Sequence, residues 1–391
     1  MITILSRWLI PGCERTGDPE VRRKYGVLCG AVGIALNILL FAGKFFAGTL
    51  SGSIAITADA FNNLSDAGSS LVTILGFKLA GQKPDPGHPF GHGRMEYLSG
   101  LAVSVLILLM GFELLQSSVQ KIRAPEPIDF SWLSVAILAA AIAVKFYMAH
   151  YNRQVGDRIN SAAMKATAAD CLSDTVSTAA VLAATLIAGF FHVNIDGWVG
   201  LAVALFILYA GCKAAKETVD PLLGQAPDPE LVAEIESTVL KYPPIQSIHD
   251  LIVHDYGPGR MMISLHAEVP VDGDLLSMHD TIDLVEQTLR ENFHCGAVIH
   301  MDPIVTDDQE VLRMRSKMCQ LVQVIDRRIT VHDFRMVTGP THTNLIFDVA
   351  APFDVKLPDG EIRRQVEEIV SLLDGNYNAV VTVDRIYASK E

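Results

Sequence analysis

Residues 53–80 read SIAITADAFNNLSDAGSSLVTILGFKLA, an apolar stretch long enough to cross a lipid bilayer. A helix spans the hydrocarbon core with about 20 predominantly apolar residues. This stretch nevertheless carries Asn62 and Asp66, which are four residues apart and therefore lie on one helix face. An aspartate at the centre of a membrane helix costs about 2.5–3.5 kcal/mol on insertion scales, so we expect a functional reason for it.

A second apolar stretch repeats this pattern. Residues 166–177 read ATAADCLSDTVS and place Asp170 and Asp174 at the same spacing. If the two helices face each other, four oxygen-bearing side chains converge on one point. Hydrogen bonding between helices is the alternative, and it explains an asparagine well. Three carboxylates favour a bound cation, because ionised carboxylates repel one another unless a cation lies between them.

The chain divides into an apolar part and a charged part. Half of its 391 residues are apolar and only 19% are charged, with the charge concentrated after about Lys216. Six stretches have the length of a membrane helix, at about 27–50, 53–80, 97–120, 131–151, 161–190 and 194–215. The sequence predicts a lead-in at 1–25, a six-helix transmembrane domain at 26–216, and cytosolic domains at 220–305 and 312–388.

Charge distribution indicates the orientation. Lysine and arginine gather before the first span, in the second and fourth loops and after the last span. Basic residues favour the cytosolic side, so a multi-pass protein of the cell membrane with both termini in the cytosol is expected. The net charge of −13 argues against a nucleic acid partner. Six cysteines without a CxxC pair predict neither a disulfide framework nor a thiolate zinc site.

The charged part contains an internal repeat. Residues 248–270, IHDLIVHDYGPGRMMISLHAEVP, correspond to residues 331–352, VHDFRMVTGPTHTNLIFDVAAP. His249-Asp250 matches His332-Asp333, and Asp302 matches Asp384. Strand-like alternation and two helical segments in each copy predict two compact α+β units.

Three groups of residues together resemble one family. The paired polar residues of the second and fifth spans, the loop DPGHPFGHGR at 85–94, and the IHDL, SLH and IHMDP motifs of the tail are similar to those of the cation diffusion facilitators, over about residues 26–304. The resemblance implies a homodimer that exports divalent metal in exchange for protons. It also implies six helices and a cytosolic ferredoxin-like domain in each protomer, with a transport site formed by Asn62, Asp66, Asp170 and Asp174.

The ligand types indicate which ion is carried. Zinc members of the family usually supply a histidine to this quartet, whereas this chain has Asn62 and Asp170 at the matching places. Oxygen ligands suit harder cations such as manganese. The set resembles that of the family's manganese exporters, so Mn²⁺ is the predicted cargo, with zinc, iron and cadmium as alternatives. No prosthetic group is expected.

The resemblance implies two further metal sites. Asp85, His88 and His92 match a loop site of zinc members, and a solvated loop is the alternative. In the tail, five residues match positions that bind metal at the family's cytosolic dimer interface, namely His249, His266, His279, His300 and Asp302.

The second tail copy departs from this pattern. His266 corresponds to Asp348, and His300 corresponds to Thr382. The second copy is therefore predicted to serve packing or dimerisation rather than metal binding.

Two other classes of function remain open at this point. One is an intramembrane metalloenzyme, against which stands the lack of an HExxH motif or of a nucleophile with a base in the spans. The other is a metal sensor whose membrane half is an anchor, and the polar quartet inside the spans argues against it. The sequence favours a transporter over an enzyme.

Overall fold

A computed structural model describes residues 2–16, 18–51, 54–124, 131–191 and 195–386. Residues 53 and 194, where two predicted spans begin, and residues 387–388, where the second tail domain was predicted to end, lie outside them. The chain forms two compact units. The first comprises 1–225 with 255–260, and the second comprises 226–254 with 261–391.

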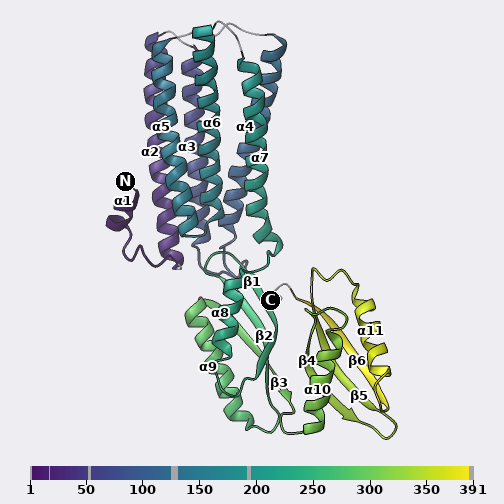
Figure 1. Cartoon of the computed structure of the whole chain (residues 1–391). Coiled ribbons are helices and arrows are strands. Elements are labelled where there is room, and N and C mark those ends of the chain that lie inside the picture. Colours follow the sequence, from purple (N-terminus) through teal and green to yellow (C-terminus); the bar gives the residue numbers. More distant parts are fainter. Residues whose placement is uncertain (1, 17, 52–53, 125–130, 192–194, 387–391) are drawn as a thin grey trace. The chain divides into compact units, whose positions relative to one another are not determined.

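Long helices build the first unit, and Figure 1 shows them running side by side as a bundle after a short α1, Ile2–Leu9. They are α2 (Pro19–Ser51), α3 (Ile54–Ala80), α4 (Met95–Arg123), α5 (Trp132–Arg158), α6 (Ala162–Phe191) and α7 (Asp196–Leu223). Within the described residues, four stretches have the length and hydropathy of a membrane span, Glu20–Phe46, Met95–Arg123, Val135–Arg158 and Gly197–Leu223. The chain is therefore a multi-pass membrane protein.

The two long helices outside that set are α3 and α6, which carry the polar quartet. Both helices also contain several Asn, Ser, Thr and Asp residues. Such residues are expensive in lipid and are expected to face other helices. The structure agrees, because Asn63, Asp66 and Asp170 are all buried.

Small residues allow the helices of this unit to approach closely. A Cβ atom added to Gly100 of α4 would lie 3.0 Å from the backbone Cα of Ala163 in α6. Close approach through small residues is typical of membrane helix contacts. A buried ion pair between Arg22 of α2 and Glu96 of α4, with Nη2 and Oε1 3.2 Å apart, also joins two helices of the bundle.

The second unit contains two three-stranded sheets, ordered β1-β2-β3 and β4-β5-β6. The elements of the first half are α8 (Pro229–Val239), β1 (Ser247–Asp255), β2 (Met261–Pro270), α9 (Leu275–Phe293) and β3 (Cys295–Ile304). The second half follows the same order with α10 (Gln309–Val322), β4 (Thr330–Thr338), β5 (Thr343–Pro352), α11 (Asp359–Ser371) and β6 (Tyr377–Ile386). Figure 1 shows α8 and α9 beside the first sheet, and α10 and α11 beside the second.

Strand register relates the two halves. Strands β2 and β3 are parallel with His266 opposite His300, and β5 and β6 are parallel with Asp348 opposite Thr382. Each half has its own apolar core, which includes Leu265 and Val285 in one and Phe347 and Val366 in the other. The family's cytosolic domain was predicted to be an α+β fold, and both halves have that character.

The repeated His-Asp motif has an unusual backbone. Asp250 and Asp333 have φ angles of 52° and 48°, in the left-handed region that few residues other than glycine adopt. In the second half, the pairing of β4 with β5 shifts register between His332 and Arg335. Irregularities of this kind re-aim side chains at functional sites. The motif therefore marks a local distortion in each half, next to a histidine.

Candidate metal centres

Helices α3 and α6 contact each other through polar side chains. The buried hydroxyl groups of Thr73 and Thr167 are hydrogen-bonded at 3.0 Å. Asp66 precedes Thr73 by two helical turns, and Asp174 follows Thr167 by two turns. The two aspartates therefore lie on the facing sides of these helices.

A third helix contributes a lysine that the sequence reasoning missed. Lys145 of α5 donates from Nζ to Asp66 Oδ2 at 2.7 Å and to Asp174 Oδ2 at 2.8 Å. The Lys145 side chain is only 5% exposed. Hydrogen bonds between an ammonium and a carboxylate are among the strong ones. One buried ammonium thus holds two of the predicted ligands together.

The other two members of the quartet are placed differently. Asp170 lies one turn before Asp174 and is 4% exposed, and its Oδ1 atom has no hydrogen-bond partner. Asn62 is exposed, whereas its neighbour Asn63 is buried. The structure therefore buries Asp66 and Asp170, joins Asp66 to Asp174 through Lys145, and leaves Asn62 exposed.

This group offers a cation several acceptor oxygens in a site shielded from water. Buried polar atoms are normally paired, so the unpartnered Asp170 Oδ1 is a free coordination position. Carboxylate oxygens suit hard divalent cations. Lys145 supplies one positive charge to two carboxylates, and an incoming divalent ion would compete with it for Asp66 and Asp174.

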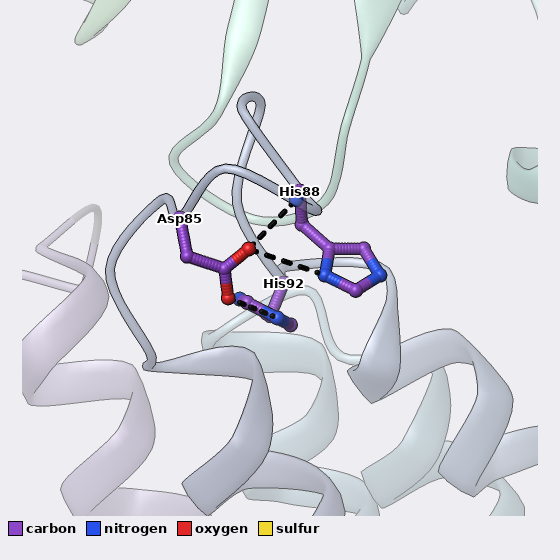
Figure 2. A group of neighbouring side chains, drawn as sticks. All are labelled: Asp85, His88 and His92. Carbon is purple, nitrogen blue, oxygen red and sulfur yellow. Dashed lines mark hydrogen bonds and ion pairs between the residues drawn. The ribbon is translucent and has the colours of Figure 1, made fainter.

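The loop between α3 and α4 brings Asp85, His88 and His92 together, as Figure 2 shows. His88 Nδ1 lies 3.5 Å from Asp85 Oδ1, and His92 Nε2 lies 3.4 Å from Asp85 Oδ2. The backbone N–H groups of His88 and Gly87 donate to Asp85 Oδ1 at 2.7 and 2.9 Å. The hydrogen bond from the His88 N–H is the largest cause that holds the pKa of Asp85 below its ordinary value.

The donor set of this loop fits a metal ion of the zinc type. Two imidazoles and one carboxylate are common zinc ligands. The Nδ1 atom of His92 is buried and has no hydrogen-bond partner. One metal ion between the three side chains would use ligand atoms that already lie within 4.8 Å of one another.

In the second unit, Asp302 of β3 lies at the centre of three histidines. Its Oδ2 atom is 2.8 Å from His266 Nδ1 and 3.1 Å from His249 Nε2, and its Oδ1 atom is 3.3 Å from His300 Nε2. His279 of α9 instead pairs with Asp283, with 3.4 Å between Nδ1 and Oδ2. The structure thus unites four of the five predicted tail residues.

A histidine from the second half of the tail lies beside this group. The rings of His249 and His332 have centroids 4.2 Å apart. His249, Asp250 and His332 each offer a ligand atom within 4.8 Å of the other two. The sequence alignment of the two copies already matched His332 with His249, but it could not show that the two side chains meet.

Comparison with known proteins agrees with this organisation. A family model described as the cation efflux transmembrane domain matches residues 31–223, and one described as the cytoplasmic domain of cation efflux proteins matches residues 227–304. An uncharacterized transporter of Methanocaldococcus jannaschii is 32% identical over 268 residues, which cover 68% of this chain and 94% of the relative. The cation-efflux pump FieF of Escherichia fergusonii is 30% identical over 288 residues, covering 72% of this chain and 95% of the pump. The second half of the tail comes after residue 304 in the sequence, where the second of these matches ends.

Proposed function

This chain belongs to the cation efflux family of divalent metal transporters, the cation diffusion facilitators, and from that premise we propose that it exports Mn²⁺ across the cell membrane in exchange for protons. The observation that carries the proposal is the group Asp66, Asp170 and Asp174 on α3 and α6, in which Asp66 and Asp170 are buried and the Asp174 side chain is 13% exposed. Buried carboxylates are stable when a cation neutralises them, and here that cation is the cargo or its substitute.

The choice of manganese rests on the ligand set. Every side chain of the predicted quartet binds through oxygen, and the described residues around Asp66 and Asp174 add a lysine rather than a histidine. Oxygen ligands favour manganese, and imidazole favours zinc. Zinc, iron and cadmium are the alternative cargoes.

Lys145 suggests how the negative charge of the site is reduced when no metal ion is bound, so that the protein can change conformation. With no metal bound, its ammonium binds Asp66 and Asp174. A divalent ion that enters must displace this ammonium, and the ion is released when the ammonium or protons return to the carboxylates. Metal and protons therefore compete for the same oxygens, which is the basis of antiport.

The remaining features of the transporter complete the proposal. We take α2 to α7 as six spans, with both termini in the cytosol, and two copies of the chain as the functional dimer. The two halves of the tail are a tandem duplication of the cytosolic domain, of which the second is additional to the family's single copy. An intramembrane metalloenzyme or a membrane-anchored sensor would bind metal without moving it.

Metal flux into proteoliposomes tests the proposal. Reconstituted protein should take up Mn²⁺ when the vesicle interior is acidic, and the interior pH should rise in proportion. A dye for interior pH and one for Mn²⁺ follow both ions in the same vesicles. Metal binding without flux would favour a sensor or an enzyme, and flux without a pH change would remove the proton from the mechanism.

A further inference from the structure

His249 and His332 form a buried histidine pair that the transport mechanism does not use. His249 has a side chain that is 7% exposed, and His332 is 7% exposed as a residue. Neither ring nitrogen of His332 has a hydrogen-bond partner within the described residues, and the ring nitrogens of His249 face the carboxylates of Asp250 and Asp302. Burying polar atoms without partners is unfavourable, and each such atom calls for an explanation.

Acidic groups surround this pair on both sides. The Nδ1 atom of His249 lies 3.4 Å from Asp250 Oδ2, while its Nε2 atom faces Asp302 at 3.1 Å. Asp348 lies opposite His332 in the pairing of β4 with β5. The pair therefore sits in a negative environment, which attracts a cation.

We infer that His249, Asp250 and His332 form a second divalent metal site in the tail, which joins its two halves within one chain. Two imidazoles and a carboxylate are ligands for Zn²⁺ and for ions of similar softness. Water or Asp348 would complete four-coordination. The site differs from the group around Asp302, because one of its ligands comes from β4 in the second half.

The division of ligands between the two ions follows from imidazole chemistry. A neutral imidazole has one lone pair for a metal, so His249 binds a single ion through one nitrogen. Asp302 also contacts His266 at 2.8 Å and His300 at 3.3 Å, so these three residues remain for the first ion when His249 binds the second. His249 is then available to Asp250 and His332.

The repeated motif explains how this site arises. Each His-Asp pair has its aspartate in the left-handed region, and in the second half the strand register shifts directly after His332. Strands β1 and β4 carry the two motifs. A duplicated domain that has lost the ligands equivalent to His266 and His300 thus keeps His332, because that histidine binds a metal shared with the first half.

Zinc stoichiometry of the full-length protein in detergent tests the site. After equilibration with Zn²⁺ and removal of excess, His332→Ala should retain one zinc ion fewer per chain than the unaltered protein. His342→Ala is the matched control, because His342 is an exposed histidine of the same half. It should retain the full complement.

A second variant guards against a folding effect. Asp250→Asn keeps a residue that tolerates the left-handed conformation and removes the charged ligand. It should weaken this site at least tenfold, and Zn²⁺ should raise the melting temperature of the unaltered protein more than that of either variant. The inference is overturned if both His332→Ala and Asp250→Asn retain the full zinc complement with unchanged affinity.

Discussion

Replacing Lys145 by methionine should strengthen metal binding and slow transport. In the unaltered protein, an ion that reaches Asp66 and Asp174 must break two ammonium–carboxylate hydrogen bonds of 2.7 and 2.8 Å. Hydrogen bonds to charged groups contribute about 1.5–3 kcal/mol each. Methionine has a similar length and no charge, so it removes this competitor with little change in packing.

The size of the effect follows from these bonds. The displaced Lys145 ammonium forms other favourable interactions, which offset part of the free energy lost with its two hydrogen bonds. We therefore take the contribution of one hydrogen bond as the cost of displacing it. About 1.4 kcal/mol changes an equilibrium constant tenfold, and Lys145→Met should therefore bind Mn²⁺ about tenfold more tightly or better. The gain should appear at alkaline pH, where the carboxylates are ionised, and should shrink as protons replace the missing ammonium.

Isothermal calorimetry with Mn²⁺ at several pH values measures this directly. Lys165→Met serves as the control, because Lys165 of α6 has a 25% exposed side chain and pairs with Asp157 at 3.8 Å. Flux through Lys145→Met should fall, since the metal would leave slowly. Unchanged or weaker Mn²⁺ binding at alkaline pH would refute the idea that this lysine competes with the cargo.

Three further predictions concern selectivity, the tail and the loop. Asn62→His combined with Asp170→His should shift preference toward zinc, measured as competition of Zn²⁺ with Mn²⁺ in vesicles, because imidazole replaces oxygen. Glu268→Gln should loosen the second half of the tail by about 1.5–3 kcal/mol, measured as faster hydrogen exchange in β4, because the buried Glu268 Oε2 accepts from Arg315 at 2.6 Å. Asp85→Asn should remove one loop-bound zinc ion per chain, measured by elemental analysis, because Asp85 lies between both imidazoles.

Glu268 also gives the tail a defined pH dependence. Burial raises the pKa of this carboxyl, but hydrogen bonds from Ser247 and Arg315 lower it by more, and the net pKa is below its ordinary value. A lowered pKa in the folded state stabilises the fold above the unfolded pKa, near 4.3, and this contribution is lost as pH falls through the folded pKa. Glu268→Gln should abolish that acid sensitivity, whereas the exposed Glu291→Gln should keep it.

In the variant that combines Asn62→His with Asp170→His, an unchanged preference between Zn²⁺ and Mn²⁺ would place metal selectivity outside the predicted quartet.

The sequence identified the polar residues of the two helices, but whether these helices face each other was left as a condition. A spacing of four residues places Asp170 beside Asp174 on any helix, and the cost of carboxylates in lipid makes them face other helices. Lys145 could have been found by the same argument, since it is a charged residue inside an apolar span. Spacing alone did not indicate that Asn62 is exposed, whereas Asp66 and Asp170 are buried.

The tail shows what sequence could not supply. Matching of the two copies identified His332 as the equivalent of His249 and found no equivalent of His266, so the second copy was predicted to lack a metal role. Whether His332 meets His249 depends on how the two halves pack, through contacts such as the hydrogen bond from the backbone N–H of Asp333 to Glu268 Oε1 at 3.0 Å. These contacts are distant in sequence, and no periodicity encodes them.

Transport by Asp66→Ala and Asp174→Ala, each reconstituted into proteoliposomes with an imposed pH gradient, tests the central claim most directly. Asp157→Ala is the control, since Asp157 has a 52% exposed side chain at the end of α5. The account predicts that Asp66→Ala and Asp174→Ala fold and dimerise but carry no Mn²⁺, while the control carries it at the normal rate. Near-normal Mn²⁺ flux through Asp66→Ala or Asp174→Ala would contradict the claim that these carboxylates bind the transported ion.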